Sequence, residues 1–249
     1  MDRLVHTALH GMRLHADNQR AIVAGLSNQN TVGFRKDIFS NLASAHVVGD
    51  TLSDRVFPTR GENAVDLSIG KLMPTDNPTD IALDGSGFLI GQDANNEPVL
   101  TRRGDFRIGA DRILRNGEGL TIMGDAGPIT IPNYSTIEVS ADGSILVRPP
   151  GVDLDQPPNT VGRLRLANVP VANVTRGPDG HLRPKDGQMP ANDANVRVVP
   201  KSLESSNVNP IESMVEMLQS SRSYDMKVKM LTMARELDDQ TARLMRSDR

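Results

Sequence analysis

The sequence predicts an α+β protein, in which long N- and C-terminal helices pair as a coiled-coil-like inner domain and extended connectors join them to a mainly-β middle domain. Two observations predict this fold. Apolar residues recur every three or four positions near both ends of the chain, and Asp-Gly or Asn-Gly pairs separate short apolar runs in the middle. The predicted boundaries are residues 1–35 for the N-terminal helix region, 36–77 for a connector, 78–190 for the β-rich outer domain, 191–208 for a returning connector and 209–249 for the C-terminal helix.

The N-terminal helix is predicted from Asp2 to about Asn28, because this stretch has no proline and only Gly11 before Gly25. His15 and Gln19 dilute its apolar seam, so an isolated coiled coil would be weak and packing among several helices is favoured. The members of the seam are Val5, Ala8, Met12, His15, Gln19, Ile22 and Leu26.

The segment after this helix, residues 28–36, is rich in Asn and Gly, which predicts turns with Phe34 as an anchor. Residues 36–75 show little periodicity and are predicted to be an extended connector. Within it, residues 42–48 fit a short helix or strand, and residues 61–72 read as a strand because 64–69 alternate apolar with polar residues.

The middle of the chain is predicted to be an antiparallel sandwich or barrel. Asp-Gly and Asn-Gly are the favoured residues of tight hairpins, because both central positions need positive φ. The pairs are Asp84-Gly85, Asn116-Gly117, Asp142-Gly143, Asp179-Gly180 and Asp186-Gly187. A further strand at 162–169 alternates Arg with Leu, and residues 195–200 bring the chain back towards the last helix.

The C-terminal helix has a well-defined predicted start. Asn209 can be the N-cap, Pro210 the first helical residue and Glu212 the third, which makes a capping box. No proline or glycine follows, so the helix can run for roughly 55–60 Å at 1.5 Å per residue. Its apolar series needs a partner and comprises Ile211, Met214, Val215, Leu218, Met226, Met230, Met233, Leu237 and Leu244.

Composition excludes several classes of function. The formal net charge of −3 offers no excess of positive charge for binding nucleic acid. The lack of cysteine excludes disulfides and thiolate chemistry. No run approaches the roughly 18 apolar residues of a membrane span, so direct membrane insertion is not expected. Charged residues and histidines interrupt residues 1–25, so we expect no cleaved signal peptide. The protein is then either cytoplasmic or exported by another route.

A search for catalytic chemistry finds no site. Gly85 and Gly87 suggest a dinucleotide loop, but Ile90 stands where the GxGxxG motif needs glycine. His6 and His10 could share a helix face with Asp2, yet no third metal ligand follows at a defined spacing. We therefore expect no enzyme, no cofactor, no metal and no small-molecule substrate.

Motifs lie next to the last helix and in the middle of the chain. Leu203-Glu204-x-Ser206-Asn207-Val208-Asn209 precedes the helix, and Val215-Glu216-Met217 follows within it. Residues 78–88 and 100–106 carry further motifs. In these positions the chain resembles the bacterial flagellar axial proteins, which are the rod and hook subunits.

The N-terminal segment extends the resemblance, with departures. Gly25 stands where the family usually has Asn, Ser27 where it has Ala, and Val32 where proline is frequent. The matching residues are Leu26, Asn28, Thr31, Gly33, Phe34 and Arg35. The resemblance covers nearly the whole chain in order.

The resemblance implies a structural subunit of the flagellar basal-body rod, the periplasmic drive shaft that transmits torque. Terminal helices would assemble helically as the inner core of the rod, with the β-domain outside. The chain length and residues 224–230 favour the proximal rod over the distal rod and the hook. Implied partners are other proximal and distal rod subunits and the flagellar type III export apparatus. Two alternatives stay open: a distal rod subunit, or a helical binding and assembly module outside any filament.

We expect the subunit interface to combine the helical apolar series with the motif positions. The residues are Val5, Met12, Ile22, Leu26, Asn28, Thr31, Gly33, Phe34, Leu203, Glu204, Ser206, Asn207, Asn209, Ile211, Met214, Leu218, Tyr224, Met230 and Leu237.

Overall fold

The structure is a computed structural model that describes residues 2–39, 43–47, 55–59, 63–151 and 156–247 of the 249-residue chain. The chain divides into two compact units. The helical unit contains Met1–Ser27, Phe39–Asn63 and Asn209–Arg249, and the β unit contains Asn28–Ile38 and Ala64–Val208. Two contacting terminal helices and a mainly antiparallel β middle confirm the predicted α+β class.

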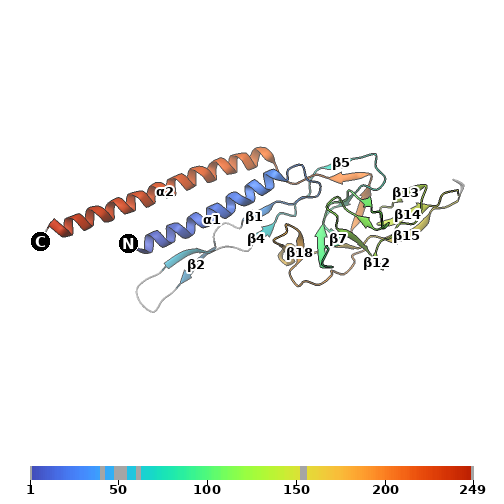
Figure 1. Cartoon of the computed structure of the whole chain (residues 1–249), viewed down its shortest axis with the longest axis horizontal. Coiled ribbons are helices and arrows are strands. Elements are labelled where there is room, and N and C mark those ends of the chain that lie inside the picture. The colour runs from blue at the N-terminus through green and yellow to red at the C-terminus, as the bar shows by residue number, and fades with distance from the viewer. Residues whose placement is uncertain (1, 40–42, 48–54, 60–62, 152–155, 248–249) are drawn as a thin grey trace. The chain divides into compact units, whose positions relative to one another are not determined.

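The helical unit is built on α1 (Asp2–Ser27) and α2 (Pro210–Ser247), which lie side by side (Figure 1). Both helices begin and end close to the predicted residues. The alternative of a short helix or strand near residues 42–48 resolves as β2 (Ala43–Val47), which pairs antiparallel with β3 (Arg55–Thr59). The sequence analysis did not predict β3. The connector residues 40–42, 48–54 and 60–62 lie outside the described part of the chain.

The start of α2 shows the expected cap. The side-chain oxygen of Asn209 accepts hydrogen bonds from the backbone N–H of Ile211 at 3.1 Å and of Glu212 at 3.4 Å. These are N–H groups that a helix N-terminus otherwise leaves unpaired. Asn209 is therefore the N-cap, and Pro210 is the first helical residue.

The β unit consists of small antiparallel sheets. Among the described residues, the largest sheet has nine strands in the open order β17-β18-β8-β7-β11-β10-β9, with β12 beside β11 and β16 beside β7. The strands β13-β14-β15 form a second sheet, and β19-β6, β20-β5 and β1-β4 form pairs. The bounds are β1 (Asp37–Phe39), β4 (Asn63–Val65), β5 (Leu72–Pro74), β6 (Ile81–Asp84), β7 (Phe88–Gln92), β8 (Pro98–Thr101), β9 (Arg107–Ile108), β10 (Leu114–Arg115), β11 (Thr121–Gly124), β12 (Gly127–Pro128), β13 (Thr136–Val139), β14 (Ser144–Arg148), β15 (Asn159–Arg163), β16 (Leu166–Ala167), β17 (Val174–Arg176), β18 (Leu182–Pro184), β19 (Arg197–Pro200) and β20 (Ser202–Glu204), with a 3-10 turn η1 (Val171–Asn173).

Two clusters of buried side chains form the core of the β unit, and they are almost entirely aliphatic. One contains Ile81, Ile122, Ile145 and Leu164 with Phe106, and the other is built around residues of β7 and β8. Alternating strands such as β14 place every second residue in the first cluster. The chain has only five Phe, two Tyr and no Trp, and its core is accordingly filled by close packing of Ile, Leu and Val.

Several local predictions in the β unit were wrong. Asp84-Gly85 and Asp186-Gly187 are not hairpin turns, because β6 pairs with β19 and not with β7, and β18 does not pair with β19. Residues 61–62 of the predicted strand 61–72 lie outside the described part of the chain, and of its described residues only 63–65 pair as a strand before β5. The Asn207 side chain binds the backbone of the next residues instead. Asn116-Gly117 is not a tight hairpin with positive φ. Instead, the Asn116 side chain accepts the N–H of Leu120 at 2.9 Å, and the positive φ falls on Gly119.

Candidate functional site

The two motif segments meet on the β unit at a site that we call the junction. It consists of the N-terminal segment, residues 33–36, the C-terminal segment, residues 202–208, and the residues that bind them. The first segment follows α1 along the chain after a short turn, and the second leads directly into α2. The junction therefore fixes the positions at which the chain leaves the β unit towards both helices.

The C-terminal segment is held by a strand pairing of its own. Residues Ser202–Glu204 form β20, and Glu204 lies opposite Leu72 of β5. The ladder continues past the strand, because the Ser205 N–H donates to the Lys71 carbonyl at 2.9 Å and the Lys71 N–H donates to the Ser205 hydroxyl at 3.0 Å. Backbone pairing thus places Glu204 independently of the N-terminal segment.

The Glu204 carboxylate is the centre of the junction, and its side chain is fully buried. One oxygen accepts the Gly70 N–H at 2.8 Å and forms an ion pair with Arg35. The other oxygen accepts the Arg102 Nε–H at 2.8 Å. Charge-assisted bonds of this kind are the strong ones, and a buried carboxylate needs them because it has lost its water.

Arg102 and Arg35 differ in what else they bind. Arg102 donates to the carbonyls of Gly87 at 2.7 Å and Gly85 at 2.8 Å. Arg35 donates to the carbonyl of its own neighbour Phe34 at 3.1 Å, and its Nε–H is buried without a partner in the described structure. Burial lowers the pKa of the Arg35 guanidinium, the charge of Glu204 opposes this fall, and the nearby charge of Arg102 adds to it.

The N-terminal segment approaches the β unit through a glycine. Gly33 has φ of +68°, and a Cβ atom on it would lie 2.5 Å from the Arg102 carbonyl carbon. The Gly33 N–H donates to the Glu204 backbone carbonyl at 2.7 Å. Only glycine allows both the left-handed backbone and this close approach.

Asn207 joins three stretches of backbone. Its side-chain oxygen accepts the Lys36 N–H at 2.8 Å, and its amide group donates to the Asp66 carbonyl at 3.0 Å. Its own N–H donates to the Phe34 carbonyl at 3.3 Å. A side chain that bonds both N–H and C=O groups in this way takes the place of a missing strand partner.

Arg176 covers the outer side of the N-terminal segment. Its guanidinium lies 5.2 Å from the centre of the Phe34 ring, which is a cation–π contact. It also forms an ion pair with Asp37 at 2.8 Å. The roles of Arg176 and Gly70 were not predicted from the sequence, because nothing local marks them, and Arg102 was marked only as part of the motif at residues 100–106.

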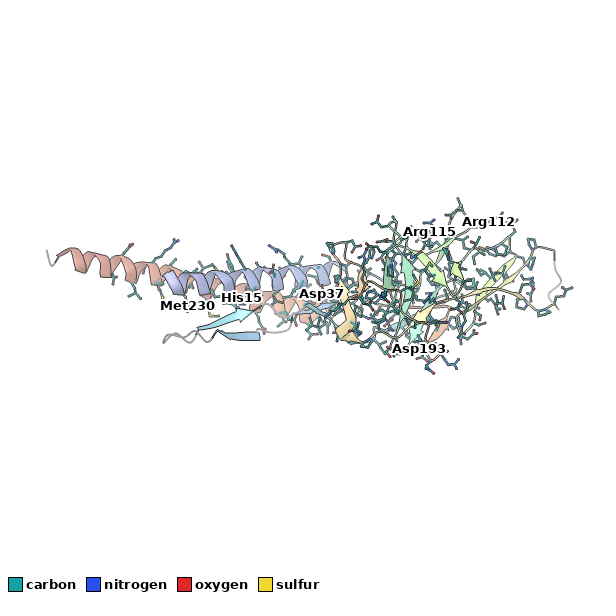
Figure 2. All side chains as sticks on the ribbon, turned by 90° about the horizontal axis from the view of Figure 1, so that it is seen from below. His15, Asp37, Arg112, Arg115, Asp193 and Met230 are labelled. Atoms are coloured by element: carbon teal, nitrogen blue, oxygen red, sulfur yellow. The ribbon has the colours of Figure 1, made fainter. Side chains whose placement is uncertain are left out.

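The apolar series of α2 forms a second candidate surface. Most of its described members are more than half exposed, and Met230, with an exposed fraction of 62%, is among the most exposed (Figure 2). The buried or half-buried described positions on α2 are instead Ser213, Ser220, Ser223, Lys227, Leu231 and Ala234. His15 of α1 lies close enough to Lys227 that burial and this positive charge lower the pKa of the imidazole. The covered side of α2 is therefore mainly small and polar, with Leu231 as its one large apolar residue among those described, and the apolar series is left uncovered in the described structure.

The predicted interface residues thus fall into three groups. Val5 lies in α1, but its side chain is outside the described residues. Met12, Ile22 and Leu26 of α1 are half-buried. The motif residues make contacts within the chain, while Ile211, Met214, Leu218, Tyr224 and Leu237 are exposed on α2.

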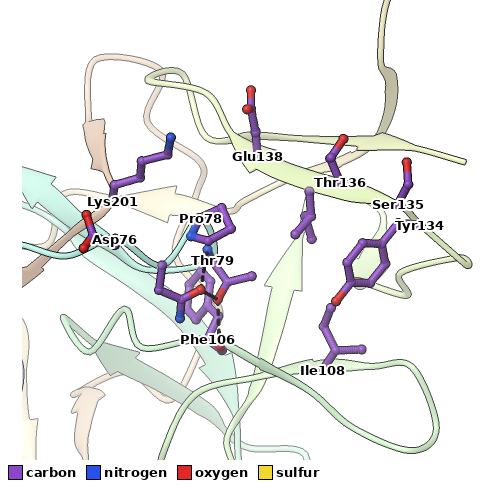
Figure 3. Close-up of a pocket in the computed structure, with 12 residues that line it drawn as sticks. Asp76, Pro78, Thr79, Phe106, Ile108, Tyr134, Ser135, Thr136, Glu138 and Lys201 are labelled. Carbon is purple, nitrogen blue, oxygen red and sulfur yellow. Dashed lines mark hydrogen bonds between the residues drawn. The ribbon is translucent and has the colours of Figure 1, made fainter. Parts of the chain in front are cut away.

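A cavity of about 580 Å³ lies in the β unit beside β13 (Figure 3). The Thr79 hydroxyl donates to the Asn77 side chain at 2.9 Å and lies beside the backbone carbonyl of Phe106. These polar groups of the cavity are therefore hydrogen-bonded to one another. No group of three or more His, Cys, Asp or Glu that could hold a metal occurs in the described part of the chain. Within the same limits, neither helix is long and apolar enough to cross a membrane.

Comparison with known proteins gives matches along the whole chain. Residues 199–244 match the model of the flagellar basal body rod FlgEFG protein C-terminal region, and residues 82–147 match that of the flagellar hook protein FlgE/F/G D1 domain. The flagellar basal-body rod protein FlgF of Salmonella typhimurium is 34% identical, over 98% of this chain and 99% of that protein. FlgF of Escherichia coli is 33% identical over 98% and 97%. The flagellar basal-body rod protein FlgG of Buchnera aphidicola is 29% identical over 90% and 92%.

Proposed function

Because this chain belongs to the family of flagellar basal-body rod proteins and is a structural subunit of the rod, we propose that it occupies the proximal rod and assembles there through its terminal helices. The family is structural, and the chain is not an enzyme. Assembly with other rod subunits follows from membership of the family. The position in the rod, the interface and the export route belong to this proposal.

The uncovered apolar series of α2 is the observation that carries the proposal. Ile211 and Met233 are 74% and 61% exposed, so the series stays open from the first turn to near the end of the helix. A contiguous apolar surface of this kind marks an interaction site in a soluble protein. Because α1 lies against other positions of α2, the partner that covers the series is another subunit.

The proposed interface uses the exposed members of the α2 series together with the half-buried apolar residues of α1. The junction residues support it from inside the chain, because they lie shortly after the end of α1 and directly before the start of α2. In this proposal residues 1–35 and 209–249 contribute the inner core of the rod, and residues 78–190 form its outer domain. Connectors at 36–77 and 191–208 join the two.

The proposed neighbours are proximal and distal rod subunits. The resemblance to the axial proteins also supports export through the flagellar type III apparatus and a final position in the periplasmic part of the basal body. A distal rod position and a binding module outside any filament are the alternatives. A defined small oligomer of the purified chain, with the α2 series buried, would favour the module.

The test is quantitative mass spectrometry of purified basal bodies from the source cell. A few copies of this chain per basal body would support the proximal rod, and a few dozen would support the distal rod. Presence in the cytosol together with absence from basal bodies would refute both positions and leave the binding module.

A further inference from the structure

Each residue of the N-terminal segment has a partner in the C-terminal segment. Gly33 donates to the Glu204 carbonyl, Lys36 donates to the Asn207 side chain and Phe34 accepts from the Asn207 N–H. Arg35 pairs with the Glu204 carboxylate. Without residues 204–207 these groups have nothing in the junction to replace their bonds to water.

The reverse dependence is much weaker. The C-terminal segment pairs with β5 and with Lys71, and the Glu204 carboxylate binds Gly70 and Arg102. All of these partners lie outside the N-terminal segment. The C-terminal segment can therefore dock on the β unit by itself, with its buried carboxylate already paired.

The charges reinforce this order. Arg35 and Arg102 both point at a single carboxylate, so two buried positive charges share one negative charge. If Glu204 is absent, the guanidinium groups repel each other in a site that excludes water. Arg102 keeps the carbonyls of Gly85 and Gly87, whereas Arg35 keeps only the adjacent Phe34 carbonyl. Without Glu204, Arg35 is therefore the arginine that moves out of the junction, and the N-terminal segment undocks with it.

We propose that Glu204 is the latch of an ordered closure, in which the N-terminal segment docks on the β unit only after the C-terminal segment has docked. The N-terminal segment is made first during synthesis, because chains grow from that end. It nevertheless has to wait for nearly the whole chain. The segments leading into α1 and α2 thus become fixed together, at the end of folding, and a chain that lacks Glu204 keeps its N-terminal helix unanchored. This inference is independent of the position in the rod.

The Arg176 contacts limit how strong the dependence is. Arg176 contacts the Phe34 ring, pairs with Asp37 and donates to the Arg35 carbonyl at 2.5 Å without the help of Glu204. The Lys36 carbonyl also accepts the Asp66 N–H at 2.9 Å. These contacts lie at the partly exposed edge of the site, where an ion pair contributes little. They guide the N-terminal segment back to the junction but do not replace the buried pair.

The test is hydrogen exchange measured by NMR on the full chain, residue by residue. The Lys36 amide reports the N-terminal segment, and the Ser205 amide reports the C-terminal segment. Arg35→Met should raise the exchange rate of Lys36 by roughly a hundredfold, the factor expected for loss of one partner of a buried pair. The exchange rate of the Ser205 amide should stay within about threefold of its wild-type value, because Glu204 keeps its ion pair with Arg102. Equal acceleration at both amides would overturn the order of docking.

Glu204→Gln should accelerate both amides, because it removes the charge that both arginines share. The double variant Glu204→Gln with Arg35→Met should then exchange more slowly at Ser205 than Glu204→Gln alone, since one of the repelling cations has gone. If the double variant exchanges as fast or faster, the pair contributes only hydrogen bonds and the latch is refuted. If Glu204→Gln fails to fold, the double variant and Arg35→Met still test the order of docking. The proposed latch requires that both of these variants fold.

The matched controls use an ion pair elsewhere in the β unit. Arg183 binds Asp179 at 2.7 Å. Arg183→Met and Asp179→Asn repeat the two chemical changes away from the junction. Both controls should leave the exchange rates of the Lys36 and Ser205 amides unchanged. Faster exchange of these amides in either control would mean that general destabilisation explains the result.

Discussion

Replacing Gly33 by alanine tests how closely the N-terminal segment must approach the β unit. The added methyl carbon would lie 2.5 Å from the carbonyl carbon of Arg102 and 2.6 Å from the backbone nitrogen of Arg103. Real side chains do not approach backbone atoms this closely, so the turn has to move away. Movement of the turn lengthens the Gly33 hydrogen bond to Glu204 and withdraws Arg35 from its carboxylate partner.

The expected loss of stability has two parts. An alanine with φ near +68° carries a left-handed strain of about 1–2 kcal/mol. Forcing a methyl group into a packed site adds about 1–3 kcal/mol. Together they destabilise the β unit by about 2–5 kcal/mol, a large part of the roughly 5–15 kcal/mol that stabilises a typical domain.

Gly187 provides a control with the same backbone conformation. Its φ is +66°, and a Cβ atom there would meet nothing within 4 Å. Gly187→Ala therefore carries the left-handed strain alone, about 1–2 kcal/mol. The difference between the two variants isolates the close approach at Gly33.

The assay is urea unfolding followed by tyrosine fluorescence. The chain has two tyrosines and no tryptophan, so a Tyr224→Phe background leaves Tyr134 as the reporter of the β unit. Gly33→Ala should unfold at clearly lower urea than Gly187→Ala. Equal midpoints and slopes would mean that the segment can dock without the close contact, and the account of the junction would be wrong.

The remaining predictions concern both helices and the surface of the β unit. Asn209→Ala removes the α2 cap and should lower helix stability by about 1 kcal/mol, seen in thermal melts by circular dichroism at 222 nm; an unchanged melt would contradict the capping role. Met230→Asp should block incorporation into the rod without changing the melt of the free chain, whereas Ser221→Asp, an exposed position outside the apolar series, should assemble normally; equal effects would argue against the proposed interface. The Arg183 hydrogen bond lowers the pKa of Asp179 from 3.8 to about 2. The pair therefore stabilises the fold above about pH 4 and is lost as pH falls towards 2. Urea midpoints of Asp179→Asn should show a slightly smaller drop over that range, since the pair is partly exposed; a larger drop than in wild type would reverse the assigned sign.

The sequence predicted what is encoded locally. The start of α2 follows from Asn209 and Pro210, and the end of α1 at Ser27 lies where the helical spacing of apolar residues stops. The glycines of the four Asp-Gly pairs, Gly85, Gly143, Gly180 and Gly187, have positive φ as expected, although their aspartates do not. In each case the residues that decide the structure are neighbours along the chain.

The structure of the junction could not be predicted in this way. Its central ion pairs join residues 35, 102 and 204, which belong to three distant segments. Resemblance to a family marked Gly33, Glu204 and Asn207 as important but not what they bind. The failed strand at 61–72 has the same origin, because Asn207 takes the place of a strand neighbour.

The face of α2 that packs against α1 could not be predicted from the sequence either. The apolar series of α2 pointed to a helix partner, and α1 was the natural candidate. In the structure the pairing side carries Ser213 and Ser220, whose small side chains let helices approach closely. Periodicity identifies an apolar face, but it does not say which of two faces a particular neighbour takes.

The exposed face of α2 also has a chemical consequence. Four methionines of the apolar series, Met214, Met226, Met230 and Met233, are exposed on it. Oxidants convert exposed methionine to the sulfoxide, which is polar and no longer suits an apolar contact. A free subunit is therefore open to chemical damage on the surface that we propose as its interface, and burial of that face in an assembly would protect the same sulfur atoms. Oxidation of the free protein and protection of an assembled one would then depend on the same methionine side chains.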